Sequence, residues 1–107
     1  MDANVALRKS VIRACQDMNA KGLNQGTSGN ISVRIDGGML ITPSGVDYDQ
    51  MQPDELVFVS NDGAYDDDKV PSSEWRFHLA SYRARPDANA VVHNHALNSA
   101  IVSILNK

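Results

Sequence analysis

Residues 31–42, ISVRIDGGMLIT, have the sequence pattern of a β-hairpin. Apolar and polar residues alternate through ISVRID, and successive side chains of a strand point to opposite faces. Gly37 and Gly38 supply the turn, and the apolar segment MLIT supplies the returning strand. The alternation predicts one apolar face of the first strand, formed by Ile31, Val33 and Ile35.

Helical and strand patterns alternate along the rest of the chain. Apolar residues recur at helical spacing after the N-terminus, and Gly22 is placed to end that helix. Pro71 and Ser72 precede a second helical pattern, and Pro86 follows it. The expected elements are helices over 4–21, 72–85 and 97–107, and further strands over 55–60 and 89–95. Interleaved helices and strands with at least one hairpin predict a mixed α/β layered domain.

Size, charge and cysteine content narrow the classes of protein to which the chain can belong. Its 107 residues suffice for one small domain. The formal net charge of -3 argues against nucleic acid or an anionic membrane as a partner, because both bind basic patches. The N-terminal segment MDANVALRKS lacks the apolar core of a signal peptide, and the single cysteine, Cys15, forms no intrachain disulfide. Both features indicate a cytoplasmic protein in which Cys15 is a buried structural thiol.

The segment VVHNHALNSA, residues 91–100, places two of the three histidines of the chain one residue apart. In a strand, the side chains of His93 and His95 point to the same face. Two imidazoles on one face form either a polar stripe or half of a metal site, and imidazole nitrogen binds Zn²⁺ well. The spacing alone leaves both interpretations open.

Glu74 and His78 lie on the predicted helix that leads into this strand. A carboxylate at the start of a helix is favoured by the helix dipole, and it can also act as a general base or a metal ligand. His78 follows four residues later on the same helix face, which allows a metal pair but favours a packed, hydrogen-bonded histidine that orients its neighbours. The acidic run Asp66, Asp67 and Asp68 indicates a solvated loop rather than a cation site.

Three short segments are rich in glycine, serine, threonine and asparagine: GTSGN at 26–30, TPSG at 42–45 and SS at 72–73. Backbone N–H groups and hydroxyls of this kind bind phosphate, most readily where a loop meets the N-terminus of a helix. GTSGN is not a Walker loop, because no lysine follows at the required spacing. Each segment is also an ordinary turn, so the composition by itself favours neither interpretation.

Four longer segments, GLNQGTSGNISVR, MLITPSGVDY, VPSSEWRFHLASYRARPDANAVVHNHA and AIVSILNK, occur in this order and closely resemble the class II aldolase/adducin family. The resemblance covers nearly all of the chain and implies a central, mainly antiparallel sheet between helical layers, assembled as a homotetramer. It implies that His93 and His95 bind zinc and that Glu74 is the catalytic acid/base, which can also contact the metal. It further implies a substrate phosphate site formed by Gly29, Asn30, Ser44, Gly45, Ser72 and Ser73.

The resemblance also implies a reaction. A zinc-dependent member of this family is expected to cleave a ketose 1-phosphate, here L-fuculose 1-phosphate, to dihydroxyacetone phosphate and L-lactaldehyde. The alternatives within the family are a pentulose-phosphate 4-epimerase, whose acidic position is usually aspartate where this chain has Glu74, and a sugar-phosphate dehydratase. A non-catalytic module, as in the adducin branch, is a further alternative. The truncation favours it, whereas His93, His95 and Glu74 argue against it because that branch lacks the metal ligands.

The family supplies a third histidine ligand from a later segment, and no histidine follows His95 in this chain. Residues 1–107 are therefore expected to be the N-terminal domain of a longer enzyme. By itself this domain is expected to bind zinc weakly, to show no aldolase turnover, and to associate through surface that the rest of the enzyme would cover.

Overall fold

The computed structural model describes residues 5–20, 29–94 and 98–102. Its elements are, in chain order, α1 (Val5–Ala20), β1 (Asn30–Ile35), β2 (Gly38–Ile41), the short 3-10 helices η1 (Tyr48–Gln50) and η2 (Pro53–Glu55), β3 (Val57–Ser60), α2 (Trp75–Ala84), β4 (Ala90–Asn94) and β5 (Asn98–Val102). The predicted hairpin is present as β1 and β2. No helix within the described ranges is long and apolar enough to cross a bilayer.

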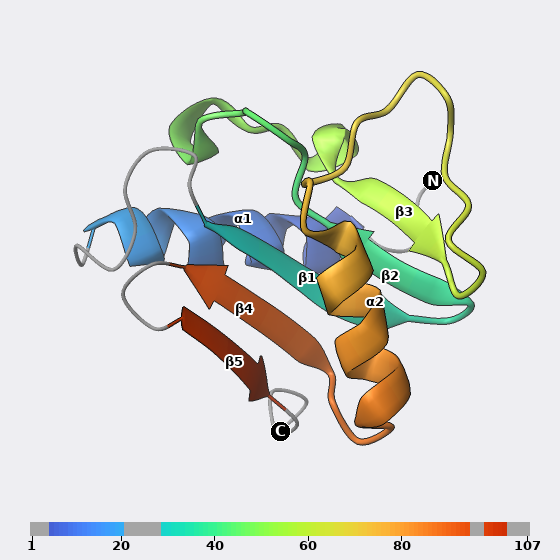
Figure 1. Cartoon of the computed structure of the whole chain (residues 1–107). Coiled ribbons are helices and arrows are strands. Elements are labelled where there is room, and N and C mark those ends of the chain that lie inside the picture. Colours follow the sequence, from blue (N-terminus) through green and yellow to red (C-terminus); the bar gives the residue numbers. More distant parts are fainter. Residues whose placement is uncertain (1–4, 21–28, 95–97, 103–107) are drawn as a thin grey trace.

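The strands form one five-stranded sheet in the order β3-β2-β1-β4-β5, and every neighbouring pair is antiparallel. α1 runs behind the sheet and α2 crosses in front of it, so that each helix covers one face (Figure 1). This arrangement confirms the predicted layered α/β fold with a central antiparallel sheet. It also brings the start of β1, the end of β2 and the start of α2 to one region of the domain.

The face of the sheet toward α1 carries the apolar side of the predicted hairpin. Val11, Ile12 and Cys15 of α1 pack in one buried cluster with Ile31 of β1 and Tyr48 of η1. The Cys15 side chain is fully buried, and burial raises the pKa of its thiol to about 12. The thiol is therefore protonated and inert at neutral pH, in agreement with a structural role.

The face toward α2 carries the polar side of β1, and it is buried as well. Leu79 and Tyr82 of α2 pack in a cluster with residues of the sheet, namely Met39, Ile41, Val57, Val59 and Val91. Ser32 is directly opposite Ile41 in the β1–β2 pair, and opposite residues of an antiparallel pair point to the same face. Ser32 is 0% exposed, so the sheet is covered on both sides.

The helix predicted for residues 97–107 is wrong over Asn98–Val102, which form β5 instead. β5 pairs with β4 from Ala90↔Val102 to Asn94↔Asn98. A helix in these residues would leave one edge of β4 without backbone partners, whereas strand pairing satisfies the N–H and C=O groups of both segments. β-branched residues such as Ile101 and Val102 are also compatible with a strand. The remainder of the predicted helix lies outside the described residues.

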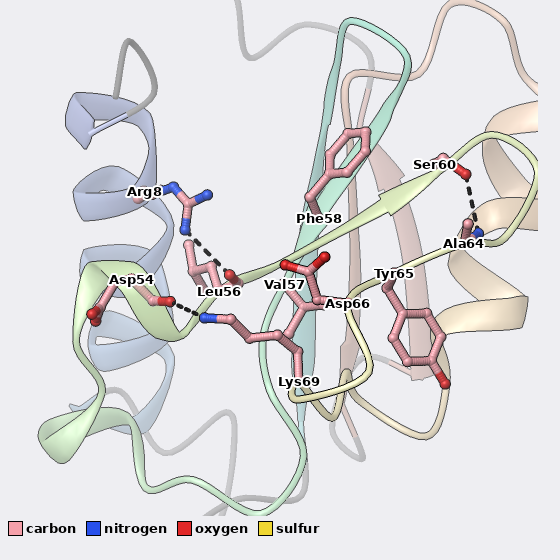
Figure 2. A pocket seen from close by; sticks show the side chains of 10 residues that line it. All are labelled: Arg8, Asp54, Leu56, Val57, Phe58, Ser60, Ala64, Tyr65, Asp66 and Lys69. Carbon is pink, nitrogen blue, oxygen red and sulfur yellow. Dashed lines mark hydrogen bonds between the residues drawn. The ribbon is translucent and has the colours of Figure 1, made fainter. Parts of the chain in front are cut away.

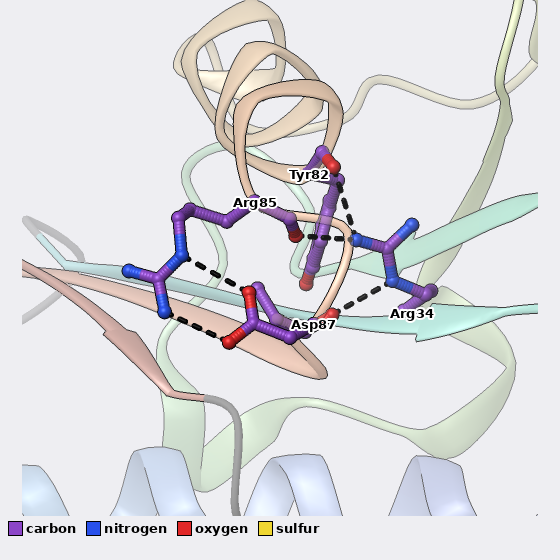
Figure 3. A network of polar contacts seen from close by, with 5 residues as sticks. Arg34, Tyr82, Arg85 and Asp87 are labelled. Atoms are coloured by element: carbon purple, nitrogen blue, oxygen red, sulfur yellow. Dashed lines mark hydrogen bonds and ion pairs between the residues drawn. The ribbon is translucent and has the colours of Figure 1, made fainter.

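Arg34 of β1 joins the sheet to the C-terminal end of α2. Its guanidinium donates to the carbonyl oxygens of Tyr82 at 3.1 Å, Arg85 at 3.1 Å and Ala88 at 2.7 Å, and it lies 4.7 Å from the centroid of the Tyr82 ring (Figure 3). Carbonyls at the end of a helix lack intrahelical partners and attract positive charge. Arg34 therefore fixes the end of the helix that carries His78 and Tyr82.

We expect Arg34→Met to lower the free energy of unfolding by about 1.5–3 kcal/mol, because hydrogen bonds from a charged donor in a half-buried position are lost. Urea denaturation followed by circular dichroism measures the change. Arg85→Met is the matched control, since the Arg85–Asp87 ion pair is 2.9 Å long but both side chains are at least half exposed. Equal midpoints for the two variants would contradict the role of Arg34.

Candidate functional site

The described parts of the three predicted phosphate segments, residues 29–30, 42–45 and 72–73, meet around Thr42, which follows β2. The Thr42 N–H donates to the Ile31 carbonyl at 3.1 Å, and the Thr42 hydroxyl accepts from the Ile31 N–H at 3.3 Å. On its other side, the Thr42 carbonyl accepts from the Ser72 N–H at 2.9 Å. The Ser44 N–H donates to the Val70 carbonyl at 3.0 Å. These bonds hold the start of β1, the loop after β2 and the loop before α2 side by side.

The predicted phosphate-binding residues differ in how accessible they are. Asn30 and Ser72 are buried, with exposed fractions of 5% and 6%, whereas Ser44, Gly45 and Ser73 are exposed. Because the N–H groups of Ser44 and Ser72 are used within the fold, they are not available to a ligand. Among the described residues, no acceptor is bonded to the N–H groups of Gly45 and Ser73. In these loops, the backbone N–H groups of Gly45 and Ser73 are therefore the ones that can bind a ligand.

Gly29 and Gly45 give the loops their shape. The carbonyl of Gly29 accepts a buried hydrogen bond from the Tyr48 hydroxyl, which attaches the start of β1 to η1. Gly45 has a φ of 72°, a left-handed conformation that costs a side-chain-bearing residue energy, and nothing lies within 4 Å of the position that a Cβ would take. The backbone at Gly45 is therefore open to a ligand.

Ser72 organises the start of α2, which begins at Trp75 rather than at residue 72 as the sequence predicts. The Ser72 carbonyl accepts from the Trp75 N–H at 3.0 Å, and its hydroxyl accepts from the Glu74 N–H at 3.2 Å. Glu74 occupies the N-cap position of the helix without a side-chain capping bond, and it is exposed. Its carboxylate is thus left to solvent or to a ligand, next to the loop cluster.

His93 lies on the face of the sheet that α2 covers. It is directly opposite Asn30 in the β1–β4 pair, so the two side chains point to the same side. Its ring contacts the edge of the Phe77 ring, with centroids 5.8 Å apart. Phe77 is three residues after Glu74, in the first turn of α2. His93, Asn30 and the start of α2 therefore belong to one region of the domain.

The donors that the structure describes fit part of a zinc site. An imidazole and a carboxylate are ordinary zinc ligands, and His93 and Glu74 supply one of each. His95, the other predicted ligand, lies outside the described residues. Within the described ranges, no group of three His, Cys, Asp or Glu side chains could hold a metal ion. Asp66, Asp67 and Asp68 are exposed loop residues, as the sequence predicts.

His78 is buried with a complete set of hydrogen bonds. Its Nδ1 lies 2.6 Å from the Ser32 hydroxyl, its Nε2 is bonded to Oδ1 of Asn30, and Ser32 is 2.8 Å from the hydroxyl of Tyr82. This agrees with the prediction of a packed, hydrogen-bonded histidine. Ser32 and Tyr82 were not recognised from the sequence, because Ser32 belongs to the polar face of the hairpin. The four-residue helical spacing from His78 to Tyr82 is the one sequence signal that links these two residues.

A cavity elsewhere in the domain is separate from this site. It has a volume of about 550 Å³ and lies between the start of α1, η2 and the loop after β3 (Figure 2). Arg8 and Lys69, which line it, donate to backbone carbonyls of η2 and its flank at 2.7–3.2 Å. None of the predicted site residues lines this cavity.

Comparisons with known proteins agree with one another. Residues 9–107 match the family model described as the class II aldolase and adducin N-terminal domain. The 5-methylthioribulose-1-phosphate/5-deoxyribulose-1-phosphate aldolase of Escherichia coli O45:K1 (strain S88) is 57% identical over 95% of this chain and 48% of its own length. The L-fuculose phosphate aldolase of E. coli K12 is 54% identical over 94% of this chain and 47% of its own length.

The solved structures give the same picture. The crystal structure of YgbL from E. coli superimposes with a TM-score of 0.81 at 35% identity, over 88% of this chain and 46% of that chain. The present chain thus spans about half the length of the relatives that it matches.

Proposed function

Because the chain belongs to the class II aldolase and adducin N-terminal domain family, we propose that it is the half of a ketose 1-phosphate aldolase that binds the phosphate and moves the proton. One observation carries the proposal: three loops separated in sequence meet around Thr42, beside the exposed carboxylate of Glu74. The region combines anion donors with a proton acceptor, as this cleavage requires.

The residues of this chain are proposed to supply phosphate donors and one acid/base. Glu74 removes the proton of the C4 hydroxyl while the C3–C4 bond breaks, so that C4 becomes the aldehyde and the electron pair passes to the C2–C3 enediolate. Glu74 then returns the proton to C3, which gives dihydroxyacetone phosphate. The 1-phosphate, held by Gly29, Asn30, Ser44, Gly45, Ser72 and Ser73, keeps the reacting bond in place during both proton transfers.

Zinc is the proposed cofactor, held by His93 and His95, with Glu74 as a further ligand before substrate binds. When bound, Zn²⁺ supplies Lewis-acid stabilisation of the negative charge that develops on the substrate oxygens. Catalytic zinc sites generally use three protein ligands and one open position. A third protein ligand from a segment beyond these residues, and a homotetrameric assembly, are parts of the same proposal.

L-fuculose 1-phosphate is the proposed substrate, with 5-methylthioribulose 1-phosphate as the second candidate. Relatives named for each of these activities are 54% and 57% identical to this chain. Both sugars carry the phosphate on C1 next to the ketone, and they differ at the aldehyde end. The proposed phosphate residues contact only the shared half, so they suit either substrate.

The test is a chimera in which the whole of this chain replaces the matching segment of the E. coli K12 L-fuculose phosphate aldolase, which is 54% identical. We expect release of dihydroxyacetone phosphate from L-fuculose 1-phosphate, measured by a coupled assay, because the chimera joins these residues to the segment that is proposed to supply the third zinc ligand. The 5-methylthioribulose ester is assayed beside it. A folded, zinc-loaded chimera that cleaves neither sugar would refute the proposed function.

A further inference from the structure

We propose that His78 is a positioning residue of the phosphate site, which holds the side-chain amide of Asn30 with its nitrogen turned toward the anion. The inference rests on the proposed function, since it explains how one of the proposed phosphate contacts is oriented. Asn30 is buried and has two chemically opposite ends, an accepting oxygen and a donating nitrogen. Only one of its two orientations presents a donor to phosphate.

The hydrogen bonds around His78 select that orientation. Oδ1 of Asn30 only accepts, so Nε2 of His78 must carry the ring proton. A neutral imidazole has one N–H, so Nδ1 is the acceptor, and the Ser32 hydroxyl donates to it over 2.6 Å. The oxygen of Ser32 then accepts from the Tyr82 hydroxyl over 2.8 Å. The chain of donors thus runs from Tyr82 through Ser32 and His78 to Asn30.

Burial keeps every member of this chain in the required protonation state. His78 is 0% exposed and has no carboxylate among its side-chain hydrogen-bond partners, and burying an unpaired charge is costly, so the ring is neutral. Desolvation raises the pKa of Tyr82 to about 12, so its hydroxyl keeps the proton that it donates.

The bond from His78 to Oδ1 fixes the direction in which the amide nitrogen of Asn30 points. The oxygen and nitrogen of a planar amide point to opposite sides, so fixing the oxygen on His78 turns the nitrogen away from the ring. Among the described residues, no acceptor is bonded to this nitrogen. Ile31, the next residue, is bonded to Thr42, which joins the loops of the proposed site. Without His78, the amide could turn and present its oxygen to the phosphate, which repels it.

The experiment uses the chimera described above, labelled with ¹⁵N, and inorganic phosphate as the probe. The ¹⁵N shifts of the His78 ring report which nitrogen carries the proton, and the Asn30 side-chain NH₂ signal reports phosphate binding. We expect a proton on Nε2, and a phosphate dissociation constant raised about ten- to hundredfold in His78→Leu, which removes the donor to Asn30. His78→Gln retains an N–H near the same position and should recover most of the affinity.

Two further variants make the result specific. Ser81→Ala removes another buried hydroxyl of α2, one that donates to the Phe77 carbonyl at 2.9 Å, and it should leave phosphate binding unchanged. Asn30→Ala should weaken phosphate binding as much as His78→Leu, and the double variant should lose no more than either single change. If His78→Leu fails to fold, Ser32→Ala keeps the ring and removes the hydroxyl that sets its tautomer, and it should weaken binding in the same direction.

The outcomes separate the two proposals. A proton on Nδ1, or equal phosphate affinity in wild type, His78→Leu and Ser32→Ala, would overturn the role of His78 while the phosphate site stands. No phosphate binding by the unmodified chimera, with the proton found on Nε2, would instead refute the phosphate site, and with it the function that this hydrogen-bond chain is proposed to serve.

Discussion

Replacing Glu74 by glutamine is expected to lower the turnover of the chimera by about 10²–10⁴-fold, the usual contribution of a positioned acid/base. Glutamine has nearly the shape of glutamate but cannot accept the proton of the substrate hydroxyl. The exposed position of Glu74 at the start of α2 means that the fold loses little from the change. Initial rates at saturating ketose 1-phosphate, with zinc content by atomic absorption, measure the effect.

Glu55→Gln is the matched control for this variant. Glu55 is the last residue of η2, where its side chain accepts from the Gln52 N–H at 2.7 Å, and the amide oxygen of glutamine can keep that bond. We expect its turnover to equal that of the unmodified chimera. Near-normal turnover in the Glu74 variant would show that another group moves the proton.

Replacing His93 by alanine is expected to abolish stoichiometric zinc binding and to lower turnover by about 10³-fold or more. Zinc supplies several kcal/mol of stabilisation to the developing charge, and every 1.4 kcal/mol corresponds to a factor of ten. Because His93 points to the face that also carries Asn30 and the first turn of α2, its loss removes a donor from the centre of the region.

Metal removal tests the same prediction without a mutation. Dialysis of the chimera against a chelator should remove activity, and added Zn²⁺ should restore it in the unmodified chimera but not in His93→Ala. Full activity in the metal-free chimera would be incompatible with the proposed zinc chemistry. Restoration of His93→Ala by zinc would show that His93 is not a ligand.

The local elements of the fold were largely predictable from the sequence, because their signals depend on neighbouring residues. The alternation in 31–36, the glycine pair and the helical spacing in 4–21 correspond to β1, its turn and α1. Residues 98–102 are the exception. Their local pattern is compatible with a helix, and the partner that makes them a strand, β4, is supplied by the fold. Pairing across a sheet edge is a tertiary effect that local periodicity does not report.

The candidate residues of the site were also predictable, as chemical types on three loops, one helix and one strand. Sequence patterns and the family resemblance selected Asn30, Ser72, Glu74 and His93, but as separate signals each had an ordinary alternative. Distances between segments that are far apart in the chain decide whether such signals form one site, and these distances depend on strand register and loop contacts. The bonds of Thr42 to Ile31 and Ser72 are the contacts that bring them together.

The sequence by itself therefore determined the family, the order of the elements before β5 and the residue types available for the chemistry. Only the tertiary structure decided that both sides of the hairpin are buried and what the buried polar groups do. Ser32 looks like a solvent-facing residue in an alternating strand, yet α2 covers it and makes it a hydrogen-bond partner of His78. The physical reason is that a buried polar group must find its partner in space, and His78 and Tyr82 lie 46 and 50 residues away in the chain.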